Sequence, residues 1–206
     1  MASVVVLVIC TVFLIVQKRS LEKALSVVLR NVNEYDYKKQ LAETKITTLE
    51  TYLILSAQSN GKIIPENISL TDVKNNKHTT AEVFAGKTPS LVFRYSYNDC
   101  GPCVNTVFEY LWQLKNSIAP NKLRIIILPH YTELRQMIVE NTQSFKNQFT
   151  FYMTNENGIG LPIDSEWLPY LAIVDDNKQA GNIFVVDVAF QPLLEKYFKA
   201  LMENYE

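Results

Sequence analysis

The chain has 206 residues, and 48% of them are hydrophobic, which is enough for one domain with a full apolar core plus appendages. Its 20 basic and 21 acidic residues leave a net charge of −1, so the composition carries no signature of nucleic-acid binding. Three cysteines are too few for a small scaffold held together by disulfides.

The N-terminal segment is an uncharged run from Ala2 to Val16, in which all but two residues are apolar. As a helix this run reaches about 22 Å, which is short of a hydrocarbon core near 30 Å. The side chains of Lys18 and Arg19 can extend to the interface and make up part of the difference. A cleaved signal peptide is the alternative, but the run lacks a preceding basic segment and a small-residue cleavage site. We therefore predict an uncleaved transmembrane anchor at residues 1–17.

Residues 18–60 contain neither Gly nor Pro and favour a helix. Apolar residues recur along this segment with irregular heptads, which indicates a helical spacer with a capacity for self-association rather than a regular coiled coil. These residues are Leu21, Leu25, Val28, Leu29, Val32, Leu41, Ile46, Leu49 and Leu53. Asn60-Gly61-Lys62 and Pro65 mark the end of the spacer. We therefore predict a folded domain over residues 61–206.

Short apolar runs predict strands and amphipathic stretches predict helices within residues 61–206. The expected strands are 90–93, 123–128, 168–174 and 182–188, and the expected helices are 104–115, 131–142 and 191–205. The first of these strands and the first helix flank a pair of cysteines.

The motif Cys100-Gly101-Pro102-Cys103 places two thiols at a spacing that allows a disulfide to form and break as a reaction. If a helix begins at Cys100, unpaired backbone N–H groups and the helix dipole favour the thiolate there. Cys103 then lies within bonding reach but is more buried. A strand, a short loop, this motif and a helix together indicate redox chemistry.

Two other interpretations of the motif are a zinc site and a catalytically idle remnant in a binding module. A zinc site needs a second pair of ligands, but the remaining cysteine, Cys10, lies in the apolar N-terminal run. The two histidines, His78 and His130, are more typical of solvated surface positions. We therefore predict no metal site, and we expect no cofactor.

The strand, motif and helix resemble the thioredoxin superfamily, in which Gly-Pro is the pair found between the cysteines of thioredoxins themselves. Segments 68–72 and 79–87, with Asn75-Asn76 as the turn, are similar to the hairpin and lead-in of the membrane-tethered, TlpA-like branch. The resemblance covers residues 61–206. It implies a thioredoxin-like fold of the α/β class, with a central mixed sheet flanked by helices, and the activity of a thiol–disulfide oxidoreductase.

The resemblance assigns roles residue by residue. Cys100 would be the attacking thiolate, and Cys103 would resolve the mixed disulfide. Gly101-Pro102 would restrain the active-site turn and help to set the redox potential. Pro169 would be the cis-proline that faces the cysteines and the substrate. Pro162 is the competing candidate, but a strand-like run directly follows Pro169.

Two neighbours of the motif depart from the thioredoxin pattern and are candidates for tuning it. Arg94 stands where thioredoxins usually have a carboxylate, and a guanidinium favours a thiolate but cannot accept its proton. Asp99 stands where they usually have Trp, and its negative charge opposes a thiolate at the next residue. The missing base could be Glu109, Asp164 or Glu166, among which the sequence does not select.

These observations predict a membrane-tethered oxidoreductase that reduces disulfides of envelope proteins. An unidentified electron donor would then return the enzyme to its reduced form. The alternative is a non-catalytic, thioredoxin-like interaction module anchored in the membrane. Basic residues follow the apolar run, which favours a cytoplasmic C-terminal part, whereas the TlpA-like resemblance implies a periplasmic one. We follow the resemblance and expect the redox domain in the periplasm.

Overall fold

The computed structural model describes the backbone of residues 2–119, 121–143, 145–155 and 157–205, and within these ranges the side chains from residue 17 onward. Contacts between residues divide the chain into two compact units, Met1–Glu50 and Thr51–Glu206. The boundary lies ten residues upstream of the predicted one, 60/61.

The first unit is a single helix, part of α1 (Ala2–Ser59), so the predicted spacer is helical through Ser59. From residue 17 to residue 47 every side chain of α1 is exposed, including several large apolar ones. Among the residues searched, no helix has both the length and the apolar character needed to cross a membrane. The apolar run of the predicted anchor, at residues 1–17, lies almost entirely outside the described side chains.

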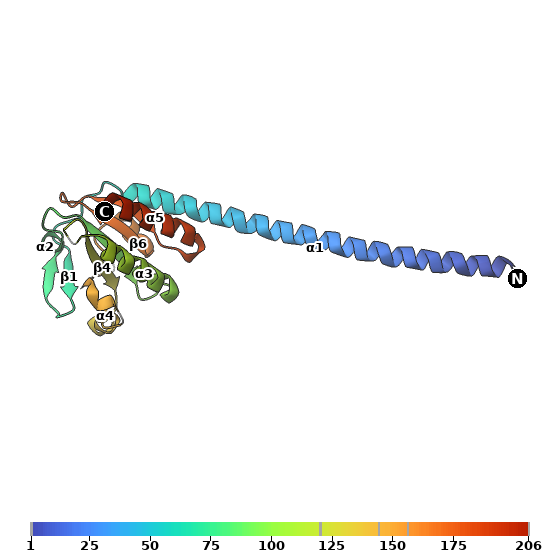
Figure 1. Cartoon of the computed structure of the whole chain (residues 1–206), viewed down its shortest axis with the longest axis horizontal. Coiled ribbons are helices and arrows are strands. Elements are labelled where there is room, and N and C mark those ends of the chain that lie inside the picture. Colours follow the sequence, from blue (N-terminus) through green and yellow to red (C-terminus); the bar gives the residue numbers. More distant parts are fainter. Residues whose placement is uncertain (1, 120, 144, 156, 206) are drawn as a thin grey trace. The chain divides into compact units, whose positions relative to one another are not determined.

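The second unit is built around a mixed sheet (Figure 1). Among the described residues this sheet has seven strands, in the order β2-β1-β5-β4-β3-β6-β7. Strands β3, β4 and β5 run parallel. On one side of β3, strand β6 is antiparallel to both of its neighbours, β3 and β7, and on the other side of the sheet β1 is antiparallel to both of its neighbours, β5 and β2. The strands are β1 (Ser69–Asp72), β2 (Lys77–Thr79), β3 (Ser90–Ser96), β4 (Arg124–His130), β5 (Thr150–Met153), β6 (Tyr170–Val174) and β7 (Ala180–Val185).

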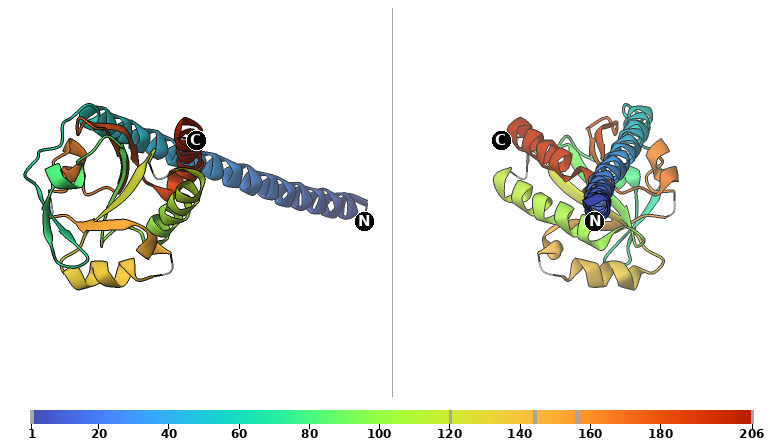
Figure 2. Two further views of the ribbon diagram at one scale, coloured as in Figure 1. Left: turned by 60° about the vertical axis from the view of Figure 1, so that its left-hand side comes forward. Right: turned by 90° about the vertical axis from the view of Figure 1, so that its right-hand side faces the viewer.

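Helices cover both faces of the sheet (Figure 2). The helices of the second unit, after the end of α1, are α2 (Thr80–Val83), α3 (Gly101–Ser117), α4 (Leu134–Asn141) and α5 (Gln191–Tyr205), with 3₁₀ turns η1 (Lys146–Gln148), η2 (Pro162–Glu166) and η3 (Val188–Phe190).

Side chains alternate along β3 and so feed two separate clusters of buried residues. Leu91, Phe93 and Tyr95 pack with α3, α4 and α5 on one face of the sheet. Val92 packs on the other face with α2, η2 and the end of α1. Arg94 follows Val92 on that second face, although the rest of the cluster is apolar. This alternation therefore places a charged side chain in a position where the pattern requires an apolar one.

Helix α3 forms because its apolar residues recur at helical spacing and become wholly buried. Val107, Phe108, Leu111 and Leu114 are each 0% exposed and pack against the sheet. Helix α5 lies beside α3, where the rings of Tyr110 and Phe198 stack with centroids 5.1 Å apart. The packing of α3 fixes the position of its N-terminus at the end of β3.

A helix and a strand of the structure were not predicted from the sequence. Residues 80–83, in the segment compared with a hairpin and lead-in, form the short helix α2, because Thr79 and Glu82 make a capping box. The Thr79 N–H donates to Glu82 Oε2 at 2.8 Å, and the Glu82 N–H donates to Thr79 Oγ1 at 3.3 Å. Strand β5 was not predicted, because four residues after a 3₁₀ turn give too short a pattern.

The end of α1 belongs to the second unit, which is why that unit begins before Gly61. Tyr52 and Leu55 pack against the core on the α2 side of the sheet. The Tyr52 hydroxyl donates to Asp187 Oδ2 at 2.9 Å, and the buried Ser59 hydroxyl oxygen accepts from the Ile163 N–H at 3.0 Å. The last turns of the predicted spacer are therefore part of the folded domain.

Candidate active site

Cys100 and Cys103 are joined by a disulfide at the N-terminus of α3, with their Cα atoms 5.2 Å apart. Cys100 is exposed, whereas Cys103 is only 6% exposed. An incoming thiolate can reach the first residue of the pair much more easily than the second. The structure thus gives the two sulfurs unequal access to solvent.

Local sequence explains this geometry. Cys100 is the N-cap of α3, and its sulfur accepts a hydrogen bond from the Cys103 N–H at 3.3 Å. Pro102 lies in the first turn of the helix, where the absence of an N–H removes no helical hydrogen bond. Gly101 and Pro102 are both exposed. When the disulfide is reduced, the N–H groups of this helix end favour a thiolate at the cap.

Arg94 is fully buried in the sheet and has an acidic partner distant in sequence. Its Nε lies 3.6 Å from Asp164 Oδ1, close enough for an ion pair but too far for a hydrogen bond. Its guanidinium carbon lies 5.7 Å from the centroid of the Trp167 ring. In the described part of the chain, none of its three nitrogens has a hydrogen-bond partner.

Asp164 is 3% exposed and holds several groups besides Arg94. Its Oδ2 accepts from the Ile159 and Leu161 N–H groups at 3.0 and 2.9 Å, and its Oδ1 accepts from the Tyr170 hydroxyl at 3.0 Å. Burial raises the pKa of this carboxyl, and the hydrogen bonds and the Arg94 charge oppose that rise. Both oxygens are engaged, which argues against a free proton acceptor.

The other two base candidates from the sequence are Glu109, on α3, and Glu166, at the end of η2. Both are exposed. Of the three carboxylates, only Asp164 lies in the protein interior beside Arg94. The structure therefore places Asp164 beside the predicted tuning residue Arg94, whereas Glu109 and Glu166 lie at the surface.

Asp99 shapes the loop between β3 and Cys100. Its Oδ2 accepts a hydrogen bond from the Ser96 N–H at 2.6 Å, and the side chain is half-buried. Burial raises the pKa of Asp99, whereas the Ser96 hydrogen bond and the positive charge of Arg94 act to lower it. The two predicted tuning residues, Arg94 and Asp99, thus influence each other electrostatically.

Pro169 lies at the end of the sheet from which the chain leads to the cysteines. It directly precedes β6, whose Tyr170 is paired with Arg94 near the end of β3. Its carbonyl accepts a hydrogen bond from the Val186 N–H at 2.8 Å. No peptide bond is cis in the described residues, so the predicted cis-proline is wrong. Trans is the preferred X–Pro isomer by about 0.5–1 kcal/mol, and a sequence does not encode the exception.

A polar pocket of about 260 Å³ lies beside the motif and is lined by residues that include Asp99, Gly101 and Asn105. Lys146, only 6% exposed, donates to Asn105 Oδ1 at 3.1 Å and forms an ion pair with Glu140. The Tyr131 hydroxyl donates to Glu140 Oε2 at 3.1 Å. Tyr95 also lines this pocket, and its buried hydroxyl has no hydrogen-bond partner in the described part of the chain.

Comparison with solved structures finds the same architecture in several proteins. A candidate electron transfer protein from Aquifex aeolicus VF5 superposes with a TM-score of 0.54 at 12% identity, over 71% of this chain and 95% of that one. A candidate thiol:disulfide interchange protein DsbE from Chlorobium tepidum superposes with a TM-score of 0.50 at 14% identity, over 69% and 97% of the two chains. The chain has a thioredoxin-like fold. No protein-family model and no curated protein sequence matches it.

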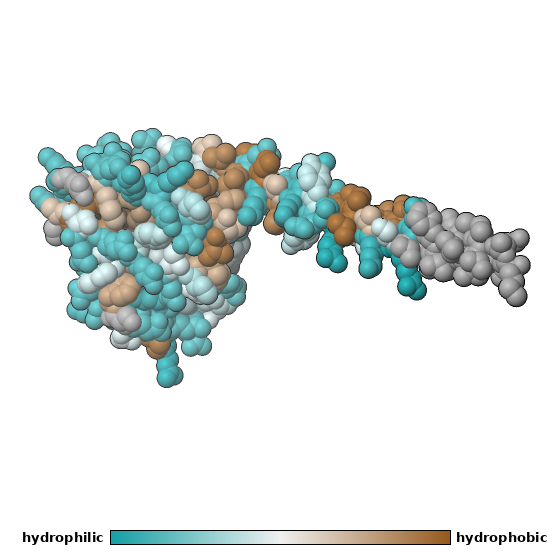
Figure 3. Space-filling model, turned by 45° about the vertical axis from the view of Figure 1, so that its right-hand side comes forward, coloured by the Kyte–Doolittle hydropathy of each residue, from teal (hydrophilic) through white to brown (hydrophobic). Residues whose placement is uncertain are grey.

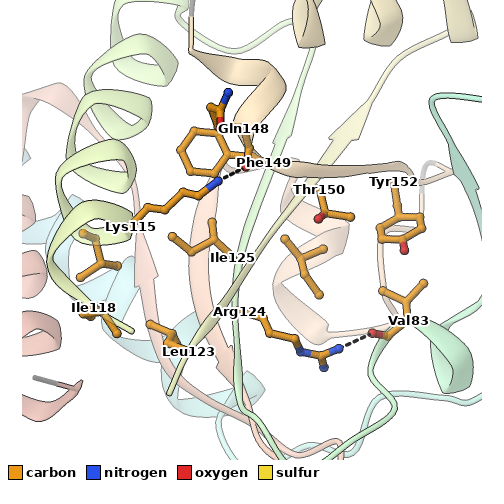
Figure 4. A pocket seen from close by; sticks show the side chains of 12 residues that line it. Val83, Lys115, Ile118, Leu123, Arg124, Ile125, Gln148, Phe149, Thr150 and Tyr152 are labelled. Atoms are coloured by element: carbon orange, nitrogen blue, oxygen red, sulfur yellow. Dashed lines mark hydrogen bonds between the residues drawn. The ribbon is translucent and has the colours of Figure 1, made fainter. Parts of the chain in front are cut away.

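A second cavity of the thioredoxin-like domain, of about 370 Å³, lies away from the disulfide (Figure 4). It is lined by Arg124 and Ile126 at the start of β4, whereas the cysteines follow the end of the parallel neighbour β3. Lys115 donates to the Gln148 carbonyl, and Arg124 Nη1 donates to the Val83 carbonyl at 3.3 Å. This cavity is larger than the one beside Gly101, but it is separated from the sulfur chemistry by the length of the sheet.

Sequence reasoning missed the residues that surround the motif from outside its own segment. Lys146, Glu140 and Tyr131 lie 28 to 43 residues beyond Cys103 and belong to no recognisable motif. The sequence around Lys146 has only a weak pattern of apolar and polar residues. A lysine in such a segment usually lies on the solvated surface. Among the residues searched, no group of three or more His, Cys, Asp or Glu side chains could hold a metal ion.

Proposed function

We propose that this protein is a membrane-tethered thiol–disulfide oxidoreductase that reduces disulfides of envelope proteins through Cys100 and Cys103. The observation that carries the proposal is the disulfide at the N-terminus of α3, with one exposed and one buried cysteine. The thioredoxin-like fold supports the class of reaction, since it presents the pair at the end of a central strand.

The reaction follows from the unequal access of the two sulfurs. In the reduced protein, the Cys100 thiolate attacks a disulfide of the partner, and the partner's first sulfur leaves as a thiolate and takes up a proton. The Cys103 thiol then loses its proton and attacks the Cys100 sulfur. The mixed disulfide breaks, the partner's second thiol is released, and two electrons have passed to the partner. A dithiol donor protein must then reduce the Cys100–Cys103 disulfide.

The tether and the compartment rest on the sequence. The uncharged run from Ala2 to Val16 forms the first part of the continuous helix α1. In this proposal, the run anchors the chain in the membrane and the thioredoxin-like domain faces the periplasm. A reporter fused after Glu206 tests this arrangement: activity of a periplasm-dependent reporter is expected, and activity of a cytoplasm-dependent one alone would contradict it.

Turnover of a protein disulfide tests the chemistry. Reduction of insulin by the full chain, with dithiothreitol as donor, should fall to the uncatalysed rate in Cys100→Ala. The matched control is Cys10→Ala, which removes the third cysteine and should leave the rate unchanged. Equal rates in the parent and Cys100→Ala would contradict the assignment and favour a non-catalytic interaction module.

Trapping of the mixed disulfide tests the division of roles and identifies the client. Cys103→Ser lacks the resolving sulfur, so it should accumulate covalent adducts that dithiothreitol releases. Cys100→Ser/Cys103→Ser, which cannot attack, serves as the control and should form none. Adducts of equal abundance in both variants would show that Cys100 is not the attacking residue.

A further inference from the structure

The part of α1 between residues 17 and 47 exposes large apolar side chains. Helices of water-soluble proteins usually bury such side chains against another part of the protein or a partner. Leu21, Leu25, Val28, Val32 and Tyr35 are between 49% and 69% exposed. Figure 3 shows hydrophobic patches interrupting the hydrophilic surface along the described part of this helix. Such a surface indicates a partner along the helix.

Six of the ten large apolar side chains that are exposed between residues 21 and 46 fit one heptad pattern along the unbroken helix α1, in which Lys39 and Ala42 occupy two of the positions. Their spacing alternates between four and three residues, as in the a and d positions of a coiled coil. The successive positions are Leu21, Leu25, Val28, Val32, Tyr35, Lys39, Ala42, Ile46 and Leu49. Val27, Leu29, Tyr37 and Leu41 are also exposed but fall outside this seam, and the sequence pattern looked irregular because Leu29 and Leu41 were included in it.

Charged residues beside the seam specify the orientation of the partner. With Leu25 at position a, Lys38 and Lys45 occupy g positions, whereas Glu43 and Glu50 occupy e positions. In a parallel pair in register, each g residue faces the e residue of the next heptad in the partner. Lys38 then faces the partner's Glu43, and Lys45 faces the partner's Glu50. An antiparallel pair would instead place Lys against Lys and Glu against Glu.

We propose that residues 21–50 pair with the same segment of a second copy of this chain as a parallel, two-stranded coiled coil. Lys45 and Glu50 have no ion-pair partner in the described part of their own chain, so both are available for the partner. Lys39, at an a position, is the kind of polar residue that fixes register and oligomeric state at some cost in stability. A parallel pair also brings both N-termini to the same end, as two anchors in one membrane require.

Charge reversal tests the pairing in the full chain in a mild non-ionic detergent. Lys38→Glu/Lys45→Glu places Glu opposite Glu, and Glu43→Lys/Glu50→Lys places Lys opposite Lys. Each double variant should dimerise at least about tenfold more weakly in sedimentation equilibrium, because the interhelical pairs set partner choice. Mixing the two, or combining all four substitutions in one chain, should restore the dimer. Helical circular dichroism checks that each variant keeps α1.

Double variants that dimerise as strongly as the parent would overturn the proposal. So would a fourfold variant or a mixture that dimerises no better than the double variants do alone. Because this measurement needs no turnover, it can fail while the proposed redox function holds, and the reverse is equally possible.

Oxidative crosslinking tests the orientation. In a Cys10→Ala/Cys100→Ser/Cys103→Ser background, Val28→Cys places a thiol in the seam, opposite its own copy only if the pair is parallel and in register. Arg30→Cys is the matched control, since position f faces away from the partner. Copper phenanthroline should crosslink the first variant and leave the second monomeric on a denaturing gel. Equal crosslinking of both, or of neither, would overturn the parallel arrangement.

Discussion

The buried pair of Arg94 and Asp164 should respond unequally to loss of either partner. Asp164→Ala leaves a guanidinium at 0% exposure without its counter-charge, and Arg cannot shed its proton. Loss of one partner of a buried pair costs about 3–5 kcal/mol of unfolding free energy. The same substitution also removes the acceptor of two backbone N–H groups. We therefore expect Asp164→Ala to lie at the upper end of that range.

Arg94→Met should cost less, about 1–2 kcal/mol, because three hydrogen-bond donors still satisfy Asp164 and the carboxyl can take up a proton. Adding Arg94→Met to Asp164→Ala should therefore recover stability, since it removes the uncompensated charge. Urea unfolding of the full chain, followed by Trp fluorescence, measures all three variants. An Arg94→Met cost equal to that of Asp164→Ala, or a double variant at the sum of the single costs, would refute this reasoning.

The pH dependence supplies a second check on the same pair. The pKa of Asp164 is raised in the folded state, so its ionisation opposes folding, and stability falls as the pH rises from the unfolded value to the folded one. Without the Arg94 charge the folded pKa rises further. The cost of Arg94→Met should therefore grow as the pH rises above the ordinary range of a carboxyl group in the same unfolding assay.

Three further perturbations follow from other contacts. Lys146→Met should cost about 2–4 kcal/mol of unfolding free energy, because it leaves the partly buried Glu140 without its ion-pair partner. The control Lys199→Met, from an exposed ion pair, should change the unfolding free energy by no more than about 0.5 kcal/mol. Equal costs of the two substitutions would contradict the reasoning. Gly158→Ala should cost at least about 2 kcal/mol of unfolding free energy, since its Cβ would lie 2.0 Å from Asp164 Oδ1 and the residue has a φ of +59°. In the control Gly101→Ala the new Cβ meets nothing within 4 Å, so this variant should unfold in urea like the parent. The pKa of Tyr52 is raised to about 12, so the free energy of unfolding should fall between pH 10 and pH 12. Tyr52→Phe has no phenolic proton to lose, so in denaturation experiments across this range its stability should fall less than that of the parent.

The sequence predicted those elements whose pattern is local. Helices α3 and α5 and strands β3, β4 and β6 have apolar residues at the proper period, and the structure confirms them with shifts of a few residues at their ends. The turn at Asn75 is also confirmed, with a φ of 68° that asparagine tolerates. The membrane anchor, the roles of the cysteines and the periplasmic location stay predictions.

The residues around the motif could not be predicted, because their meaning depends on contacts between distant segments. Arg94 is separated from Asp164 by 70 positions, and only the pairing of β3 with β6 brings them together. Lys146 appears as an ordinary surface residue until the fold brings η1 against α3 and buries the lysine against Phe108, whose ring centroid is 4.5 Å from Nζ. The isomer of the bond before Pro169 depends in the same way on tertiary context rather than on the local letters.

The attachment of the last turns of α1 to the core has a practical consequence for expression. A fragment that starts at Gly61, where glycine and proline suggest a natural cut, would lose the Ser59 hydroxyl that receives the Ile163 N–H and the Tyr52 ring that stands edge-on to Phe190. Such a truncation should be aggregation-prone even though every strand is retained. A recombinant version for crystallisation or spectroscopy should therefore begin at Thr51 or earlier.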